Sequence, residues 1–358
     1  MKPFFKISFI FIFIFSYSIV IGSKASNNLL ENVFDINLEK EIKKGNFLIG
    51  LRQYLGKNHK KEEVLIFKTE DNFLRLKSSN GLNHQSKEIK IVLKSIPLKN
   101  PIIIERLVSR PFASYESAKK ESLSLEERGL KPIITMPRSW EVWLPVQKVD
   151  QVNSNYTIKQ QIVKNKIVPY LTNEYIYKKL DGPISIISKE EIKIDNINYG
   201  KNFLLVKDSY GTWTLVQKIS FEEYLNGVLP HEIGASSPIE SLKAQAVIAR
   251  TWAIYNSNRF KEDKFHLCVT TQCQVYKPSI SNEKIKKAIS ETKYEILTYK
   301  DKPINSFYHA SNGGISATSN ESWKMKDYPY LISKLDIIDF HEKDKDFNMR
   351  TKKNLLFF

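Results

Sequence analysis

The sequence predicts a mixed α+β fold with a β-rich N-terminal part, a small helix-bearing insertion and a mainly helical C-terminal segment. Short apolar runs between polar turns dominate up to residue 108 and return over 183–218. One helical pattern interrupts them near 114–130, and helical patterns prevail from Ser220 onward. The chain has 358 residues, of which 42% are hydrophobic and 26% charged, so its composition is that of a globular protein.

The first 25 residues have the pattern of a signal peptide. Lys2 and Lys6 precede an apolar run over 7–21, and Ser23-Lys24-Ala25 is a small-x-small cleavage motif. The run is shorter than the roughly 20 residues that a bilayer span needs. We interpret 1–25 as a cleaved signal peptide, with an uncleaved N-terminal anchor as the alternative. The rest of the chain is then exported to the periplasm or cell wall and is peripheral to the membrane at most.

The chain is basic, with 55 Lys and Arg against 39 Asp and Glu and a formal net charge of +16. Nucleic acid, an anionic membrane face and the anionic cell wall would all attract such a protein. A general abundance of Lys and Asn is an equally good explanation of the charge. The predicted export and the lack of a recognised nucleic-acid-binding motif argue against nucleic acid as a partner.

Residues 26–43 are polar with little pattern and are predicted to be a linker. The β-rich part over 44–100 contains candidate strands at 46–51, 63–67, 73–76 and 88–96.

Residues 101–150 are predicted to form the insertion. A helix over 114–130 lies between a strand at 102–108 and two strands at 132–136 and 140–144. This β-α-β-β order fits a small ferredoxin-like unit.

The segment 165–358 begins with short strands and continues with helices. Its candidate strands are 184–187, 192–194, 203–206 and 212–216, followed by 295–299 and 304–308 after the helices. Ser220 and Glu223 form a capping box for a helix that should end before Pro230. Ser237 as N-cap starts a second helix that runs from Pro238 to about Asn256. A third helix is predicted over 283–293.

Two cations on the second of these helices need partners. Lys243 and Arg250 are seven residues apart and share a face with apolar residues. Buried cations are costly unless they are paired, so structural salt bridges are the favoured explanation from the residues alone. Glu232 lies just before this helix, in a predicted short connection with apolar neighbours.

Several motifs resemble the stage II sporulation protein D and amidase enhancer family. They are Tyr224-Leu225-x-Gly227-Val228-Leu229-Pro230-x-Glu232, Leu242-Lys243-Ala244-Gln245-Ala246-Val247-x-Ala249-Arg250-Thr251, Cys273-Gln274-Val275-Tyr276, Tyr308-His309-x-Ser311-x-Gly313-Gly314 and Tyr328-Pro329-Tyr330-Leu331. The resemblance in order and spacing covers about 183–332, and more weakly the region from Asn46 to about Ile96. The insertion resembles a SPOR-type glycan-binding unit.

The resemblance implies a lytic transglycosylase that cleaves peptide-stripped peptidoglycan glycan strands, with Glu232 as the catalytic residue. A lytic enzyme needs one carboxylic acid, because the 6-hydroxyl of the sugar attacks and closes a 1,6-anhydro ring, whereas a water-using glycosidase normally needs two carboxylates. Burial would raise the pKa of Glu232 for this duty. Some relatives are described as amidase enhancers, so the alternative is a glycan binder without catalysis that assists a cell-wall amidase.

The same resemblance supplies candidate substrate-binding residues. Lys243 and Arg250 match positions regarded as important in the family. Gln274 and Tyr276 carry groups that suit sugar hydroxyls, although a core role for Tyr276 is equally well supported. The turn with Ser311, Gly313 and Gly314 needs glycine and would let a glycan approach the backbone.

His266, Cys268 and Cys273 are the candidate metal ligands. Some family members bind zinc here with a second histidine before the last cysteine, where this chain has Gln272. Structural zinc usually takes four Cys or His ligands. We therefore expect no cofactor, and we favour a Cys268–Cys273 disulfide over zinc, with free thiols as the third alternative.

Overall fold

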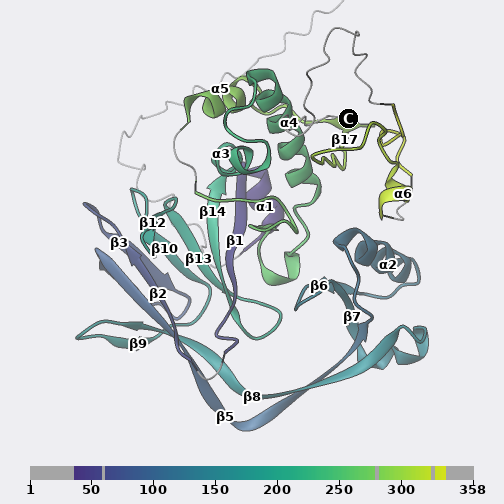
Figure 1. Ribbon diagram of the computed structural model, residues 1–358. Coiled ribbons are helices and arrows are strands. Elements are labelled where there is room, and N and C mark those ends of the chain that lie inside the picture. Colours follow the sequence, from purple (N-terminus) through teal and green to yellow (C-terminus); the bar gives the residue numbers. More distant parts are fainter. Residues whose placement is uncertain (1–35, 59–60, 279–281, 324–326, 336–358) are drawn as a thin grey trace, which may run out of the picture. The chain divides into compact units, whose positions relative to one another are not determined.

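The computed structural model describes residues 36–58, 61–278, 282–323 and 327–335, and it confirms the mixed α+β class (Figure 1). The predicted signal peptide over 1–25 lies outside these residues. In the described part of the chain, no helix has the length and apolar character that crossing a membrane requires.

The first sheet combines strands from before and after the insertion. Its strand order is β15–β1–β14–β13–β10–β3–β4. Its strands are β1 (Asn46–Leu55), β3 (Leu74–Ser78), β4 (Asn83–Ser86), β10 (Ile184–Ile187), β13 (Asn202–Lys207), β14 (Trp213–Ser220) and β15 (Leu267–Cys268). β1 pairs antiparallel with β14 and parallel with β15. The N-terminal β-rich part and the segment after residue 183 therefore form one sheet.

The second sheet has the order β12–β11–β2–β5–β7–β6, with β8 paired to β5 and β9. Its strands are β2 (Glu63–Lys68), β5 (Glu88–Ser109), β6 (Ile133–Thr135), β7 (Glu141–Pro145), β8 (Tyr156–Thr172), β9 (Tyr177–Lys179), β11 (Lys193–Ile194) and β12 (Ile197–Asn198). A separate pair joins β16 (Thr298–Tyr299) to β17 (Lys302–Pro303).

The long strands β5 and β8 lie side by side and differ from the prediction (Figure 1). β5 is one strand where two were predicted, with a register shift between Pro97 and Ile102 in place of a break. β8 was not predicted, because the N-terminal half of this strand is mostly exposed and burial imposes no alternation on its sequence.

The insertion shows the predicted β-α-β-β order of β5, α2 (Tyr115–Glu127), β6 and β7. Ser114 caps α2 by accepting a hydrogen bond from the backbone N–H of Ser117 at 3.2 Å. An ion pair between Glu116 and Arg259 joins α2 to the segment after α4. The ferredoxin-like assignment and its boundaries stay predictions.

The remaining helices are α1 (Leu38–Lys43), α3 (Phe221–Glu232), α4 (Ile239–Tyr255), α5 (Glu283–Glu291) and α6 (Ser319–Trp323), and 3₁₀ turns occupy Val146–Gln151 and Lys261–Asp263. α1 lies within the segment 26–43 that was predicted to be a linker and was not itself predicted. The predicted strand over 295–299 was too long, since β16 covers only Thr298–Tyr299, and the predicted strand over 304–308 does not form.

The start of α4 differs from the prediction. Ser237 was expected to cap this helix, but its hydroxyl donates to the carbonyl oxygen of Ile233 at 3.0 Å. Pro238 takes the N-cap position without a side-chain hydrogen bond. The hydroxyl instead ties the start of α4 to the end of α3, next to Glu232.

Two apolar cores support these elements. The first lies between the sheets and includes Phe67, Ile91 and Leu215. The second packs α3, α4 and α5 against the first sheet, and its residues include Phe47 and Leu229. This second core holds the C-terminal end of α3, and it therefore positions Glu232.

Candidate active site around Glu232

Glu232 lies in the last turn of α3. The predicted capping box is confirmed, since the Ser220 hydroxyl accepts from the backbone N–H of Glu223 while the Glu223 carboxylate accepts from that of Ser220. The prediction that α3 ends before Pro230 is wrong. A proline removes one N–H donor, and the Ile233 N–H still donates to the carbonyl oxygen of Leu229 at 3.1 Å. Glu232 is consequently at the carbonyl end of a helix and not in a loop.

The Glu232 carboxyl group is half-buried and contacts two other segments. Its Oε1 accepts a hydrogen bond from the backbone N–H of Val275 at 2.8 Å. It also hydrogen-bonds to the phenol of Tyr308. Burial raises the pKa of Glu232, and these two hydrogen bonds oppose the increase. The negative end of the α3 dipole also disfavours the ionised form.

A buried network fixes the direction of the Tyr308 hydrogen bond. Tyr224 donates its phenol hydrogen to Gln274 Oε1 at 3.0 Å, which orients the Gln274 amide. Gln274 Nε2 then donates to the Tyr308 oxygen at 3.2 Å. Because that oxygen already accepts from Gln274, its own hydrogen is available to the Glu232 carboxylate. Burial raises the pKa of Tyr308 strongly, so this phenol stays protonated.

Gln274 and Tyr276, expected from the sequence to bind substrate, are both buried. Gln274 is fully buried, and its amide is engaged by Tyr224, Tyr308 and the Ala249 carbonyl oxygen. Tyr276 stacks on Tyr224 with ring centroids 5.5 Å apart. Gln274 and Tyr276 therefore lie on the interior side of the Glu232 carboxyl group and help to hold it in place.

Gly227 allows this arrangement, because a Cβ at this position would lie 2.4 Å from Tyr276 Cε2 and 2.6 Å from the Lys277 carbonyl oxygen. We predict that Gly227→Ala lowers the free energy of unfolding by about 1–3 kcal/mol. Asn226→Ala is the matched control, since the neighbouring position is half-buried in the same helix and should change stability by less than about 0.5 kcal/mol. Urea unfolding measures both, and equal midpoints would contradict the tight contact with Tyr276.

Arg250 and Lys243 are held in ion pairs. Arg250 has a side chain only 3% exposed, and it donates to Glu222 at 2.9 Å and to the Glu295 carbonyl oxygen at 3.0 Å. Lys243 lies 2.7 Å from Glu291 and 3.0 Å from Glu240. These contacts agree with the salt-bridge explanation drawn from the residues alone, and neither cation contacts Glu232 in the described structure. The substrate-binding role that the resemblance implies for them stays a prediction.

The turn at residues 311–314 is exposed or half-buried and has the expected glycine conformations. Gly313 and Gly314 have φ angles of 67° and 99°. The Gly313 N–H donates to the Ser311 hydroxyl at 3.4 Å, and the Gly314 N–H donates to Asn312 Oδ1 at 2.8 Å. A glycan could approach the backbone here, and this role stays a prediction.

His266 is a structural residue. Its Nδ1 accepts from the Leu48 N–H at 2.8 Å, so its Nε2 carries the hydrogen and donates to the Leu38 carbonyl oxygen at 3.0 Å. Burial lowers the pKa of His266 to about 4, which keeps the ring neutral. With both ring nitrogens engaged, His266 does not fit a zinc ligand, and the side chain of Gln272 accepts a hydrogen bond from Trp140. In the part of the chain that the structure describes, no group of three or more His, Cys, Asp or Glu residues could hold a metal.

Cys268 and Cys273 are separate thiols in the structure. The Cys273 Sγ accepts from the Cys268 backbone N–H at 3.0 Å. A hydrogen bond from Cys273 is the largest cause that lowers the pKa of Cys268, to about 7. The disulfide favoured from the sequence stays a prediction.

Tyr308 is the residue of this site that the sequence analysis did not single out. It was part of a family-like motif and of a predicted strand, and no role was assigned to it. The structure places it in an irregular segment after β17, where it reaches Glu232. Glu232, Val275 and Tyr308 come from three separate motifs. The order of these motifs was therefore the only signal in the sequence that the three residues lie together.

Comparison with known proteins identifies the segment that carries this site. Residues 209–299 match a family described as Stage II sporulation protein. The amidase enhancer of Bacillus subtilis is 42% identical over 115 residues, which are 32% of this chain and 15% of that protein. Stage II sporulation protein D of Bacillus subtilis is 32% identical over 134 residues, or 33% of this chain and 39% of that protein. An uncharacterized protein of Brachyspira hyodysenteriae is 32% identical over 175 residues, or 48% of this chain and 45% of that protein.

The matches span less than half of each of these relatives. The matched segment 209–299 contains Glu232, Val275 and the buried Gln274, whereas Tyr308 lies beyond it. The segment that holds the candidate catalytic carboxyl group is therefore the part of the chain that is similar to the stage II sporulation protein D and amidase enhancer family.

Proposed function

We propose that this chain acts on the bacterial cell wall as a lytic transglycosylase that cleaves peptide-stripped glycan strands. The observation that supports this most is the half-buried Glu232, whose raised pKa suits a proton donor. Among the residues that the structure describes, no second carboxylate contributes to the pKa shift of Glu232. A single carboxyl group suits a lytic reaction better than hydrolysis by a pair of carboxylates.

In the proposed reaction, protonated Glu232 gives its proton to the oxygen of the glycosidic bond as the bond from the anomeric carbon breaks. The Val275 N–H and the Tyr308 hydroxyl stabilise the carboxylate that results. The 6-hydroxyl of the same sugar then bonds to the anomeric carbon and gives its proton to Glu232. The carboxyl group returns to its starting state, and the product has a 1,6-anhydro end.

Mass spectrometry of products from purified, peptide-free glycan strands tests this proposal. We expect 1,6-anhydro ends from the native protein and almost none from Glu232→Gln. Products with reducing ends formed by addition of water would contradict the lytic mechanism.

A second candidate is a glycan-binding amidase enhancer without catalysis, because the relative with 42% identity bears that name. In that case the purified protein would release no product from stripped glycan but would increase cleavage by a cell-wall amidase. Export through the N-terminal segment is part of both proposals, since their substrate lies outside the cytoplasm. Neither proposal includes a cofactor.

The Tyr308 hydrogen bond predicts a pH effect. It lowers the pKa of Glu232, so Tyr308→Phe should raise that pKa further. A general acid works while it is protonated and fails as the pH rises through its pKa. The alkaline limb of kcat/KM should therefore move to higher pH in Tyr308→Phe. Tyr255→Phe is the control, because its half-buried phenol contacts Tyr328 and not Glu232. An unchanged limb in Tyr308→Phe would show that the phenol does not influence the catalytic carboxyl group.

A further inference from the structure

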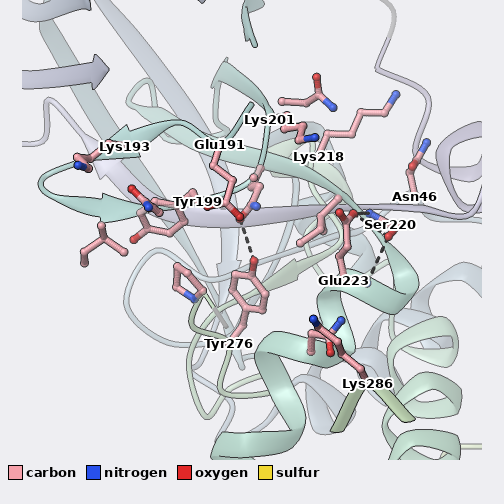
Figure 2. Close-up of a pocket in the computed structure, with 18 of the residues that line it drawn as sticks. Asn46, Glu191, Lys193, Tyr199, Lys201, Lys218, Ser220, Glu223, Tyr276 and Lys286 are labelled. Carbon is pink, nitrogen blue, oxygen red and sulfur yellow. Dashed lines mark hydrogen bonds between the residues drawn. The ribbon is translucent and has the colours of Figure 1, made fainter. Parts of the chain in front are cut away.

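A separate cavity of about 790 Å³ opens beside the N-terminal half of α3 (Figure 2). It lies between the β11–β12 hairpin, β13, β14, α3 and α5. Its volume is within the usual range for sites that bind small molecules. Neither Glu232 nor Tyr308 lines it, so this cavity is not the candidate active site.

Six of the residues that line this cavity have amide side chains, as many as have charged ones. The amides are Asn46, Asn196, Asn198, Asn202, Gln217 and Asn226. Ile197, Ile219 and Pro278 supply apolar side chains. An amide side chain offers both a donor and an acceptor, and a sugar hydroxyl or acetamido group also offers both.

Tyr276 lines the cavity, and the buried amide of Gln217 holds its hydroxyl group. The Tyr276 hydroxyl donates to Gln217 Oε1 at 3.1 Å (Figure 2). Gln217 is only 1% exposed, and its Nε2 has no hydrogen-bond partner in the described part of the chain. An unsatisfied buried donor is costly. A ligand oxygen that reached Nε2 would remove that cost.

The charges in this cavity argue against a phosphate-rich or nucleotide ligand. Three of its four lysines are already paired, Lys193 with Glu70 at 3.4 Å, Lys218 with Glu41 at 2.7 Å and Lys286 with Glu283 at 3.0 Å. Phosphate groups are normally held by clusters of available cations or by helix N-termini. The N-terminus of α3 does line this cavity, but Ser220 and Glu223 already cap it. The amide-rich lining instead matches a ligand that is rich in hydroxyl and amide groups.

We propose that this cavity binds an oligosaccharide with acetamido groups, as a second glycan site separate from the one at Glu232. The identity of the ligand as a cell-wall strand rests on the proposed function. The two sites meet at one short segment, since the Val275 N–H donates to Glu232 while the neighbouring Tyr276 lines the cavity. Along α3, Asn226 and Glu232 are six residues apart, or about 9 Å of helix.

Calorimetric titration with the tetramer of N-acetylglucosamine tests the proposal in a Glu232→Gln background, where turnover is suppressed. Asn198→Ala with Asn226→Ala removes two amides from separate elements of the cavity, and alanine is well tolerated in a helix. Asn83→Ala is the control, because Asn83 is an exposed asparagine on β4 that does not line the cavity.

We expect the double variant to bind the tetramer at least about tenfold more weakly, since two side-chain hydrogen bonds are lost. The Asn83→Ala protein should bind as its parent does. The tetramer of glucose, which lacks acetamido groups, should also bind at least about tenfold more weakly. Equal affinity for both sugars would overturn the assignment of ligand class.

Side-chain amide signals in NMR spectra locate the bound sugar. The signals of Asn198 and Asn226, identified by their loss in the alanine variants, should shift on addition of the N-acetylglucosamine tetramer. Unmoved signals together with unchanged affinity in the double variant would overturn the second site. This outcome is distinct from failure of the proposed function, which is read from 1,6-anhydro products and not from binding in this cavity.

Discussion

Glu232→Gln is expected to reduce the release of 1,6-anhydro products from peptide-free glycan by about 10²–10⁴-fold. The amide cannot donate a carboxylic proton or accept the proton of the attacking hydroxyl. It retains an oxygen that can accept the Val275 N–H, so the surrounding structure should change little. A time course of product formation, followed by mass spectrometry, measures the effect.

Glu240→Gln is the matched control for this substitution. Glu240 has a side chain 78% exposed on α4 and contacts only Lys243 among the ion pairs described. The control should cleave glycan at the native rate and unfold at the native temperature. Native activity in Glu232→Gln would exclude this carboxyl group as the acid, and loss of activity in both variants would show that the assay responds to any change of charge.

Arg250→Ala is expected to lower the free energy of unfolding by about 3 kcal/mol. The substitution removes a buried guanidinium that joins α4 to Glu222 of α3 and to the Glu295 carbonyl oxygen. The Glu222 side chain is 24% exposed, so water can solvate the carboxylate that the substitution leaves unpaired. The loss of free energy of unfolding should therefore lie at the low end of the range for breaking a buried ion pair. Chemical denaturation measures the difference.

Lys243→Ala is the comparison on the same helix. Its side chain is 27% exposed, its partner Glu240 is largely in water, and its second partner Glu291 is 40% exposed. Such a pair contributes about 0–1 kcal/mol, so this variant should unfold close to the native protein. Glycan binding is measured on both variants at a temperature where both are folded. A stable Arg250→Ala protein that no longer binds glycan would favour the substrate role that the family resemblance implies.

The sequence was informative wherever the signal is local. Ser220 and Glu223 lie three residues apart, and the capping box that they predict is present. The helix predicted over 114–130 from its apolar pattern is also present, as α2. The predicted helix end at Pro230 was wrong, because proline usually marks a helix boundary, whereas packing in the second core keeps α3 helical to Glu232.

The sequence by itself determined the α+β class, the extent of α4 and the candidacy of Glu232. The class and the helix follow from periodicity and from local start signals, whereas the candidacy of Glu232 follows from the resemblance of its motif to the family. Only the tertiary structure decided three contacts. Tyr308 reaches Glu232, the buried Gln274 donates to Tyr308, and Arg250 is paired with Glu222. Such contacts join residues far apart in the chain, 28 positions for Arg250 with Glu222 and 43 positions for Val275 with Glu232. Their partners are selected by the packing of helices against the first sheet, and no local pattern specifies that packing.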